Sequence, residues 1–203
     1  MIKASARSFA IVLLLAHPAN GGELNGTLSS RLDFYPENAD GTASEGRSVE
    51  VKIDAFHDFD ESRIVGEFIV REDEKDSGRR ITEARQAYFR TPFAGFDVFL
   101  GNRQEFWGKA ESKNVVDLIN QSDAAANEGK SGKLGAPSIS AERYLDIGDL
   151  QLWYISNFRE KTFNDSDAHP SNGVPVSSAQ YARKDGKDAD DFAVRLSSFA
   201  GDW

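Results

Sequence analysis

The 203-residue chain contains no cysteine, so disulfides and thiolate metal ligands are excluded. Its three histidines, His17, His57 and His169, form no HExxH pattern, and no glycine-rich loop of the phosphate-cradling kind is present. No side chains can be placed as nucleophile and base or as general acid and base. We therefore expect no catalytic residue, no cofactor and no metal ligand, and we do not expect an enzyme.

Long apolar runs are scarce as well. The run Phe9–Ala16 is much shorter than the ~20 residues that a membrane-spanning helix needs, which disfavours an N-terminal anchor. Lys3 and Arg7 precede it and small residues follow it, a layout typical of a secretory signal peptide. We predict that residues 1–21 are a signal peptide and that residues 22–203 form the exported domain. No other segment could cross a bilayer as a helix, so any insertion must use strands.

Positive charge is in deficit: 24 lysines and arginines face 33 aspartates and glutamates, which gives a formal net charge of -9. Removal of the predicted signal would take away two positive charges and no negative one, and would leave -11. An exported, acidic chain is a poor match for the phosphate backbone of nucleic acid. We therefore expect no nucleic-acid partner.

Alternating polar and apolar residues predict about eight strands and an all-β domain. The clearest alternation covers residues 49–55, where aliphatic and charged side chains fall on opposite faces. One face carries Val49, Val51, Ile53 and Ala55, and the other carries Glu50, Lys52 and Asp54. The remaining strand candidates lie at 26–36, 61–72, 82–88, 96–105, 138–146, 150–158 and 191–200.

Residues 80–120 predict a β-hairpin followed by a helix-like segment. In the first arm, Thr82, Ala84, Gln86 and Tyr88 share an uncharged face, and Glu83 and Arg85 fall on the other. In the second arm, Phe96, Val98 and Leu100 oppose Asp97, Phe99, Gly101, Arg103 and Glu105. One face of each arm therefore avoids charge, and the other carries charged residues of both signs.

This alternation suits two architectures, a soluble β-sandwich with its polar face in water and a membrane barrel with its polar face inside. The connections favour the barrel. Those near 57–61, 91–95 and 147–149 are short, whereas those at 37–46, 72–79, 109–136 and 160–190 are longer and polar, as in outer-membrane barrels. Aromatic residues beside the short turns also predict one interfacial girdle, formed by Phe56, Phe59, Phe93, Phe96, Tyr144 and Trp203.

Four motifs carry a resemblance to a known family. They are RQAYFR at 85–90, LGNRQEFWGKAE at 100–111, VVDLINQSD at 115–123 and AERYLDIGDLQLWYIS at 141–156. In these segments the chain resembles the porin-like outer-membrane barrels allied to the phosphate-selective and alginate-export porins. The likeness spans about Ile81 to Phe158. It departs at Asn102, where the family has arginine, and at Gln121, where the family has proline.

The resemblance implies an antiparallel, up-and-down transmembrane β-barrel in the cell outer membrane, in contact with membrane lipid and lipopolysaccharide. It also implies passive diffusion of small polar or anionic solutes through a porin-like channel. Relatives have about twice as many strands, which implies the N-terminal portion of a longer barrel, although eight strands ending at Trp203 could close into a narrow one. Whether such barrels form a homo-oligomer such as a trimer is left open.

Polar residues of the hairpin and of the loop after it form the candidate site. Rings of charge lining a pore set ion preference, although opposed charges on adjacent strands can equally pair and stiffen the wall. The pore-lining and constriction candidates are Glu83, Arg85, Asp97, Arg103, Glu105, Trp107, Lys109, Asp117 and Asn120. Because the apolar segment NVVDLIN at 114–120 would be unfavourable in water, we expect its loop to fold into the lumen and narrow it.

Two other interpretations stay open. A secreted, soluble β-sandwich could bind or adhere through its long loops, and an outer-membrane enzyme could use carboxylates of its outer loops. The paired acids Asp165/Asp167 and Asp190/Asp191 could also hold calcium through carboxylate oxygens. The first pair lacks the third carboxylate and the glycine of a calcium loop, so a solvated acidic loop is the simpler interpretation.

Overall fold

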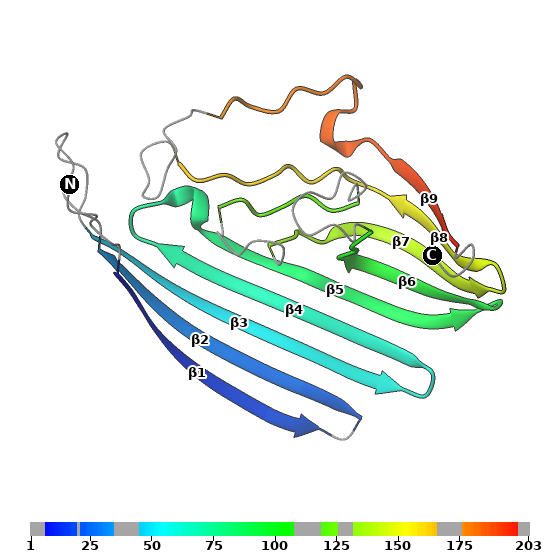
Figure 1. The fold of residues 1–203 in the computed structure, drawn as a ribbon, viewed down its shortest axis with the longest axis horizontal. Helices are drawn as coiled ribbons and strands as arrows, with labels where there is room; N and C mark the ends of the chain where they lie inside the picture. The colour runs from blue at the N-terminus through cyan, green and yellow to red at the C-terminus, as the bar shows by residue number, and fades with distance from the viewer. Residues whose placement is uncertain are drawn as a thin grey trace.

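The computed structural model describes residues 7–19, 21–34, 45–107, 119–125, 132–165 and 176–198. They form an all-β fold in which nine antiparallel strands follow one another in chain order within one sheet (Figure 1). The strands are β1 (Arg7–Ala19), β2 (Gly22–Phe34), β3 (Glu45–Phe59), β4 (Ser62–Asp73), β5 (Ile81–Phe93), β6 (Phe96–Arg103), β7 (Ala136–Leu145), β8 (Gly148–Ile155) and β9 (Asp191–Ser197). Two short 3-10 turns, η1 (Ser77–Arg79) and η3 (Gly186–Asp188), lie in the connections.

Strands β2 to β9 correspond to the predicted strands and confirm an antiparallel, up-and-down, all-β architecture. Strand β1 contains the apolar segment predicted to be a signal peptide, and it pairs with β2 from Arg7 opposite Phe34 to Ala19 opposite Gly22. This pairing describes the unprocessed chain, so cleavage stays a prediction. Strands β1 and β9 are the edges of the sheet and do not pair with each other, so the described residues form an open sheet.

The connections alternate in length, as predicted. Two residues join β3 to β4, β5 to β6 and β7 to β8. At the β5–β6 turn, Ala94 and Gly95 have φ angles of 52° and 79°, as in the two-residue hairpin turns whose twist matches the flanking strands. The connections at 74–80, 104–135 and 156–190 are longer, and their described parts lie over one face of the sheet (Figure 1).

The two faces of the sheet have opposite polarity. On the face away from the long connections, here called the outer face, Val49, Val51 and Ile53 are 48%, 37% and 40% accessible. On the covered face, here called the inner face, Arg71 and Arg85 are only 2% and 1% accessible. Aliphatic side chains that point outward and arginines that point inward are the reverse of the usual arrangement in a soluble domain.

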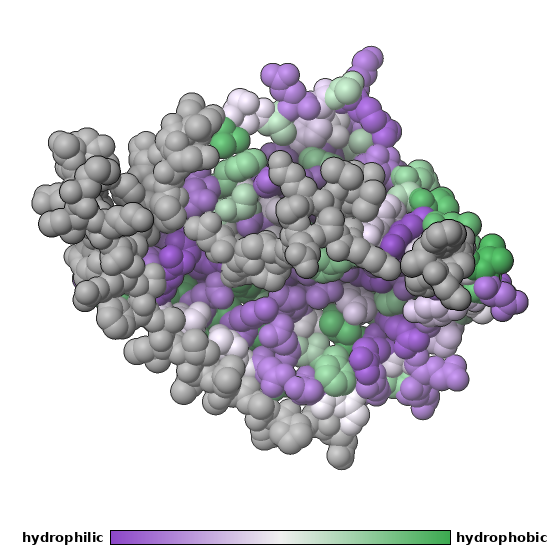
Figure 2. Space-filling model, in the orientation of Figure 1, coloured by the Kyte–Doolittle hydropathy of each residue, from purple (hydrophilic) through white to green (hydrophobic). Residues whose placement is uncertain are grey.

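Strand β9 continues this pattern to the edge of the sheet. Phe192, Val194 and Leu196 are 78%, 69% and 55% accessible, and they share the outer face with Leu152 of β8. Figure 2 shows hydrophobic residues gathered at the margin of the molecule over β8 and β9. Arg195 alternates with these residues and faces inward, where its guanidinium lies 5.9 Å from the Trp107 ring centroid.

A β-bulge in β5 overturns one predicted face. Glu67 pairs with Gln86, but the next residue, Phe68, pairs with Ala84, so Arg85 is an extra residue in β5. Gln86 therefore turns to the inner face, where its Nε2 donates to Oε2 of Glu67 at 3.1 Å. The prediction that Gln86 shares the uncharged face with Ala84 is wrong, because one inserted residue reverses the alternation beyond it.

The predicted aromatic girdle also needs a correction. Phe59, Phe93 and Tyr144 are exposed beside the short turns, as expected of girdle residues. Phe56 instead faces inward, and the guanidinium of Arg63 lies 4.6 Å from its ring centroid. Trp203 lies outside the described residues.

A small hydrophobic core lies between the loop that follows β6 and the inner face of the sheet. Its buried members are Ile119, Ala136, Trp153 and Ile155, and Trp107 and Ala193 pack against them. Loop segments therefore cover part of the inner face. The described residues form no second sheet over either face.

Candidate functional site

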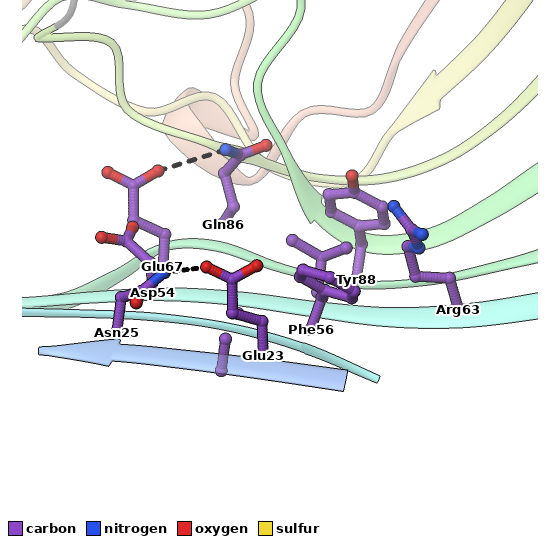
Figure 3. Close-up of a pocket in the computed structure, with 11 residues that line it drawn as sticks. Glu23, Asn25, Asp54, Phe56, Arg63, Glu67, Gln86 and Tyr88 are labelled. Atoms are coloured by element: carbon purple, nitrogen blue, oxygen red, sulfur yellow. Dashed lines mark hydrogen bonds between the residues drawn. The ribbon is translucent and has the colours of Figure 1, made fainter. Parts of the chain in front are cut away.

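The inner face is hollowed at the end where the short turns lie. This turn-end hollow has a volume of about 300 Å³ and is lined from strands β2, β3, β4 and β5 (Figure 3). Its labelled lining residues are Glu23, Asn25, Asp54, Phe56, Arg63, Glu67, Gln86 and Tyr88. The hollow thus combines carboxylates, amides and aromatic rings, groups that contact polar solutes.

Negative charge exceeds positive charge in the hollow. Glu67 has a cation partner, because Nζ of Lys52 lies 3.1 Å from its Oε1. Glu23 accepts a hydrogen bond from Asn25 at 2.5 Å, but no cation among the described residues lies within ion-pair distance of Glu23 or Asp54. Arg63 is already paired, since its Nε donates to Asp58 at 2.5 Å.

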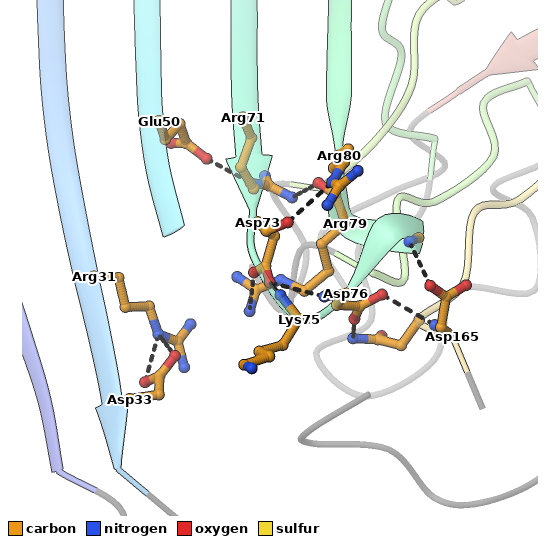
Figure 4. A network of polar contacts seen from close by, with 12 residues as sticks. Arg31, Asp33, Glu50, Arg71, Asp73, Lys75, Asp76, Arg79, Arg80 and Asp165 are labelled. Atoms are coloured by element: carbon orange, nitrogen blue, oxygen red, sulfur yellow. Dashed lines mark hydrogen bonds and ion pairs between the residues drawn. The ribbon is translucent and has the colours of Figure 1, made fainter. Parts of the chain in front are cut away.

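A second region of the inner face, here called the arginine cluster, consists of Arg71, Arg85 and Arg159 with Glu50, Glu83 and Asp123. Nε of Arg71 donates to Oε2 of Glu50 on the neighbouring strand at 2.8 Å (Figure 4). Nη2 of Arg85 donates to Oδ2 of Asp123 at 3.3 Å, and the same oxygen lies 3.8 Å from Nη1 of Arg71. Two strands therefore present arginines to one loop carboxylate.

Arg159 makes the next link between loop and sheet. Its Nη2 forms an ion pair with Oε2 of Glu83 on β5, and its Nη1 donates to the carbonyl oxygen of Gly135 at 3.0 Å. The segment after β8 and the segment before β7 are thereby attached to the same part of the sheet. Arginine suits this role because its fork of donors serves two acceptors at once.

Arg103 is the centre of a third group, on β6. Its Nη2 lies 2.8 Å from Glu105 and 2.5 Å from Glu142, and its Nη1 donates to Oγ of Ser140 at 3.0 Å. The guanidinium also stacks over the Phe99 ring, 3.7 Å from the centroid. The Trp153 ring centroid lies 5.0 Å away, so Arg103 is held by two carboxylates and two rings and acts as a fixed part of the wall.

Asn120 anchors the loop that follows β6. Its Oδ1 accepts from the backbone N–H of Glu105 at 2.6 Å, and its Nδ2 donates to the carbonyl oxygens of Arg103 and Leu134 at 2.9 and 3.0 Å. Trp107 is fixed nearby, because its Nε1 donates to Oε1 of Gln151 at 2.6 Å. The described part of the loop therefore packs on the inner face.

A clasp joins two long connections at the end away from the short turns (Figure 4). The carboxylate of Asp165 accepts from the hydroxyl and N–H of Ser77 at 2.5 and 2.9 Å and from the N–H of Gly78 at 3.3 Å. Asn164 donates in turn to Asp76 at 2.7 Å. The Ser77 hydroxyl, ahead of the two backbone N–H groups, lowers the pKa of Asp165.

The segment that continues toward β9 carries one perturbed tyrosine. The Tyr181 hydroxyl donates to the carboxylate of Glu160, and this hydrogen bond raises the pKa of Tyr181 to about 12. The rings of Tyr181 and Phe158 meet edge to face with centroids 6.2 Å apart. Tyr181 is therefore a neutral contact between loop segments.

Within the described part of the chain, the predicted site residues divide into three sets. Glu83 and Arg85 contact the inner loops, while Arg103, Glu105, Trp107 and Asn120 lie together where the loop leaves β6. Asp97 lies apart near the β5–β6 turn and pairs with Arg90 at 2.6 Å. Lys109 and Asp117 lie outside the described residues, as does most of the segment expected to be helix-like.

Sequence reasoning missed several residues of this face. Glu142 could have been recognised as an inward position of an alternating strand, but it lies opposite Asp97, so strand pairing would not have predicted its contact with Arg103. Asp123 and Arg159 lie in irregular segments whose composition gives no signal of their partners. The inward position of Gln86 and Tyr88 depends on the bulge, which alternation does not reveal.

No group of three or more possible metal ligands occurs among the described residues. Asp165, one of the proposed calcium ligands, binds the Ser77 turn instead, and Asp167 lies outside the described residues. Within the same part of the chain, no helix is long and apolar enough to span a membrane. No protein-family model matches the chain, and no curated protein or solved structure matches it significantly.

Proposed function

We propose that the chain forms part of the wall of a porin-like outer-membrane β-barrel through which small polar or anionic solutes diffuse passively. The inverted polarity of the sheet carries this proposal. Outward aliphatics such as Val51 and Leu28 are 37% and 44% accessible, while Arg71 and Arg85 on the other face are almost fully covered. A lipid-facing exterior and a polar interior require this distribution.

The exposed apolar area of the outer face favours a lipid environment. Each apolar Å² left in water costs roughly 25 cal/mol relative to an apolar environment, and the outer face presents aliphatic side chains on strand after strand. Contact with lipid hydrocarbon removes this cost. The backbone suits the same surroundings, because hydrogen bonds between neighbouring strands satisfy its polar groups.

A barrel requires that both edges of the sheet be paired. Strands β1 and β9 present unpaired edges in the described sheet, and edges within a bilayer must be paired. We propose that further strands of a longer barrel, of which this chain is the N-terminal portion, complete the ring once residues 1–21 have been removed. Closure of β2 to β9 on themselves is the narrower alternative.

The lining supports a polar passage that carries both signs of charge. The three arginines of the arginine cluster all have carboxylate partners, and the turn-end hollow carries excess negative charge. Paired charges orient polar solutes without creating a strong field. These features support the passage of small polar solutes.

Reconstitution tests the proposal directly. The full-length protein should require detergent after signal removal, migrate faster on gels before heating than after it, and produce discrete conductance steps in planar bilayers. Reversal potentials in a salt gradient then measure the preference between anions and cations. A monodisperse protein that stays soluble without detergent and never inserts into bilayers would contradict the proposal.

A soluble β-sandwich is the main alternative architecture. It needs a second sheet packed against the aliphatic face, because that is where its core would lie. The described residues place loop segments on the charged face and leave the aliphatic face uncovered. We therefore rank the barrel wall first.

A further inference from the structure

Asp123 lies at the junction of three separate parts of the chain. Its Oδ2 lies 3.3 Å from Nη2 of Arg85 on β5 and 3.8 Å from Nη1 of Arg71 on β4. Its Oδ1 accepts from Oγ1 of Thr162 at 2.6 Å. One carboxylate therefore connects the loop after β6, the loop after β8 and the wall of the sheet.

The two loops are also joined by their backbones. Asp123 and Thr162 form an isolated parallel bridge, and the N–H of Ala124 donates to the carbonyl oxygen of Thr162 at 3.2 Å. Segments 119–125 and 158–163 thereby form one unit, here called the inner-loop pair. The unit lies on the inner face, where a solute would pass.

We propose that Asp123 is the positioning residue that holds the inner-loop pair against the wall and so sets the width of the passage at this level. This inference rests on the proposed function. Both arginines are nearly inaccessible, so their link to Asp123 is shielded from water and from salt. Asn120 holds the start of the same loop independently, by its bonds to Arg103 and Leu134. Loss of the Asp123 link therefore loosens residues 122–125 from the wall, while Asn120 keeps its backbone contacts and Arg159 keeps its ion pair with Glu83.

The absence of cysteine makes a distance experiment straightforward. Spin labels are placed on Thr82→Cys, on the outer face of β5, and on either Ser122→Cys or Lys161→Cys, one in each loop. All three positions are exposed. Pulsed electron paramagnetic resonance in detergent or nanodiscs then measures the distance from the wall to each loop of the full-length protein.

Asp123→Asn removes the negative charge that faces both arginines, while the amide oxygen can still accept from Thr162. We expect the distance distributions of both labels to broaden and shift together, with the smaller change at position 161, because Arg159 still pairs with Glu83. Thr162→Val instead removes the side-chain link between the loops and keeps both the link to the wall and the backbone bridge, so the label at position 161 should broaden more than the label at position 122. Asp58→Asn is the matched control, because it removes a carboxylate from an exposed ion pair near a short turn and should change neither distribution.

Unchanged distance distributions in Asp123→Asn overturn the positioning role of Asp123. A shift of the label at 122 alone overturns the joint movement of the two loops. If Asp123→Asn does not fold, Thr162→Val still tests the coupling, and an unchanged label at 161 contradicts it.

Bilayer recordings of the same variants separate this inference from the proposed function. Higher conductance in Asp123→Asn supports both. If the loops are released but neither variant nor wild type conducts, the loop-holding role stands and the channel does not. Unchanged conductance despite released loops removes Asp123 as the residue that sets the width.

Discussion

The turn-end hollow and the arginine cluster lie on the same face of the same sheet, yet their charged residues are arranged differently. In the cluster, Arg71, Arg85 and Arg159 each have a carboxylate partner, and loop segments cover them. In the hollow, Glu23 and Asp54 have no cation within ion-pair distance among the described residues. Alternation alone would have treated both regions as equivalent polar lining.

Solvent access explains the difference. A charge that is covered must be paired and hydrogen-bonded, because desolvation of an unpaired ion is strongly unfavourable. The Glu23 carboxylate in the open hollow is exposed to water and needs no cation partner. The covered region therefore acts in structure, and the open region is available to solutes.

The largest expected effect is on stability, from the covered region. Arg85→Ala leaves Asp123 buried without one of its two cations, and loss of one partner of a buried pair typically destabilises by about 3–5 kcal/mol. Urea unfolding of the detergent-refolded protein measures this. Arg63→Ala, which breaks an exposed pair beside the hollow, should change the unfolding midpoint little. Equal effects of the two changes would remove the distinction between the regions.

A second prediction separates the outer from the inner face. Val51→Arg places a charge among outward aliphatics, and an arginine facing lipid near the bilayer centre costs about 2–4 kcal/mol. Ser29→Arg is the matched control, because Ser29 lies on the inner face opposite Glu50. Folding yield and unfolding free energy in lipid vesicles should fall for Val51→Arg and not for Ser29→Arg. The reverse order would indicate that the outer face does not contact lipid.

The third prediction concerns solute charge at the hollow. The double change Glu23→Gln and Asp54→Asn removes two carboxylates without cation partners, so the reversal potential in a salt gradient should shift toward anion preference. The same recording on Glu50→Gln, whose carboxylate is paired with Arg71, should show a smaller shift per charge removed. A larger shift in Glu50→Gln would place the selective region at the cluster.

The smallest expected effect is local and depends on pH. The bonds from Ser77 and Gly78 lower the pKa of Asp165, so the stability they contribute is present above the pKa of an unfolded aspartate, about 3.9, and is lost as pH falls through the lowered value. Amide chemical shifts of Ser77 and Gly78 should titrate below that ordinary value. Asp165→Asn should abolish the titration, and a midpoint at or above 3.9 would contradict the clasp.

Much of the sheet was predictable because the signals are local. Alternation with a period of two identified the strands and placed Val49, Val51 and Ile53 on the aliphatic face. Short connections with Gly95 or Gly148 at or beside the turn indicated tight hairpins. Only part of the candidate site could be predicted from the sequence, which identified Arg103 and Glu105 but not Glu142.

By itself, the sequence determined the all-β class, the antiparallel order, the position of the tight turns and the two-faced polarity, because each depends on neighbours within a few residues. Only the tertiary structure decided that a bulge at Arg85 turns Gln86 inward and that one carboxylate, Asp123, meets Arg71, Arg85 and Thr162. These contacts join residues far apart in the chain. They depend on strand register and loop path, and a shift of one residue in register would exchange the faces on which these side chains lie.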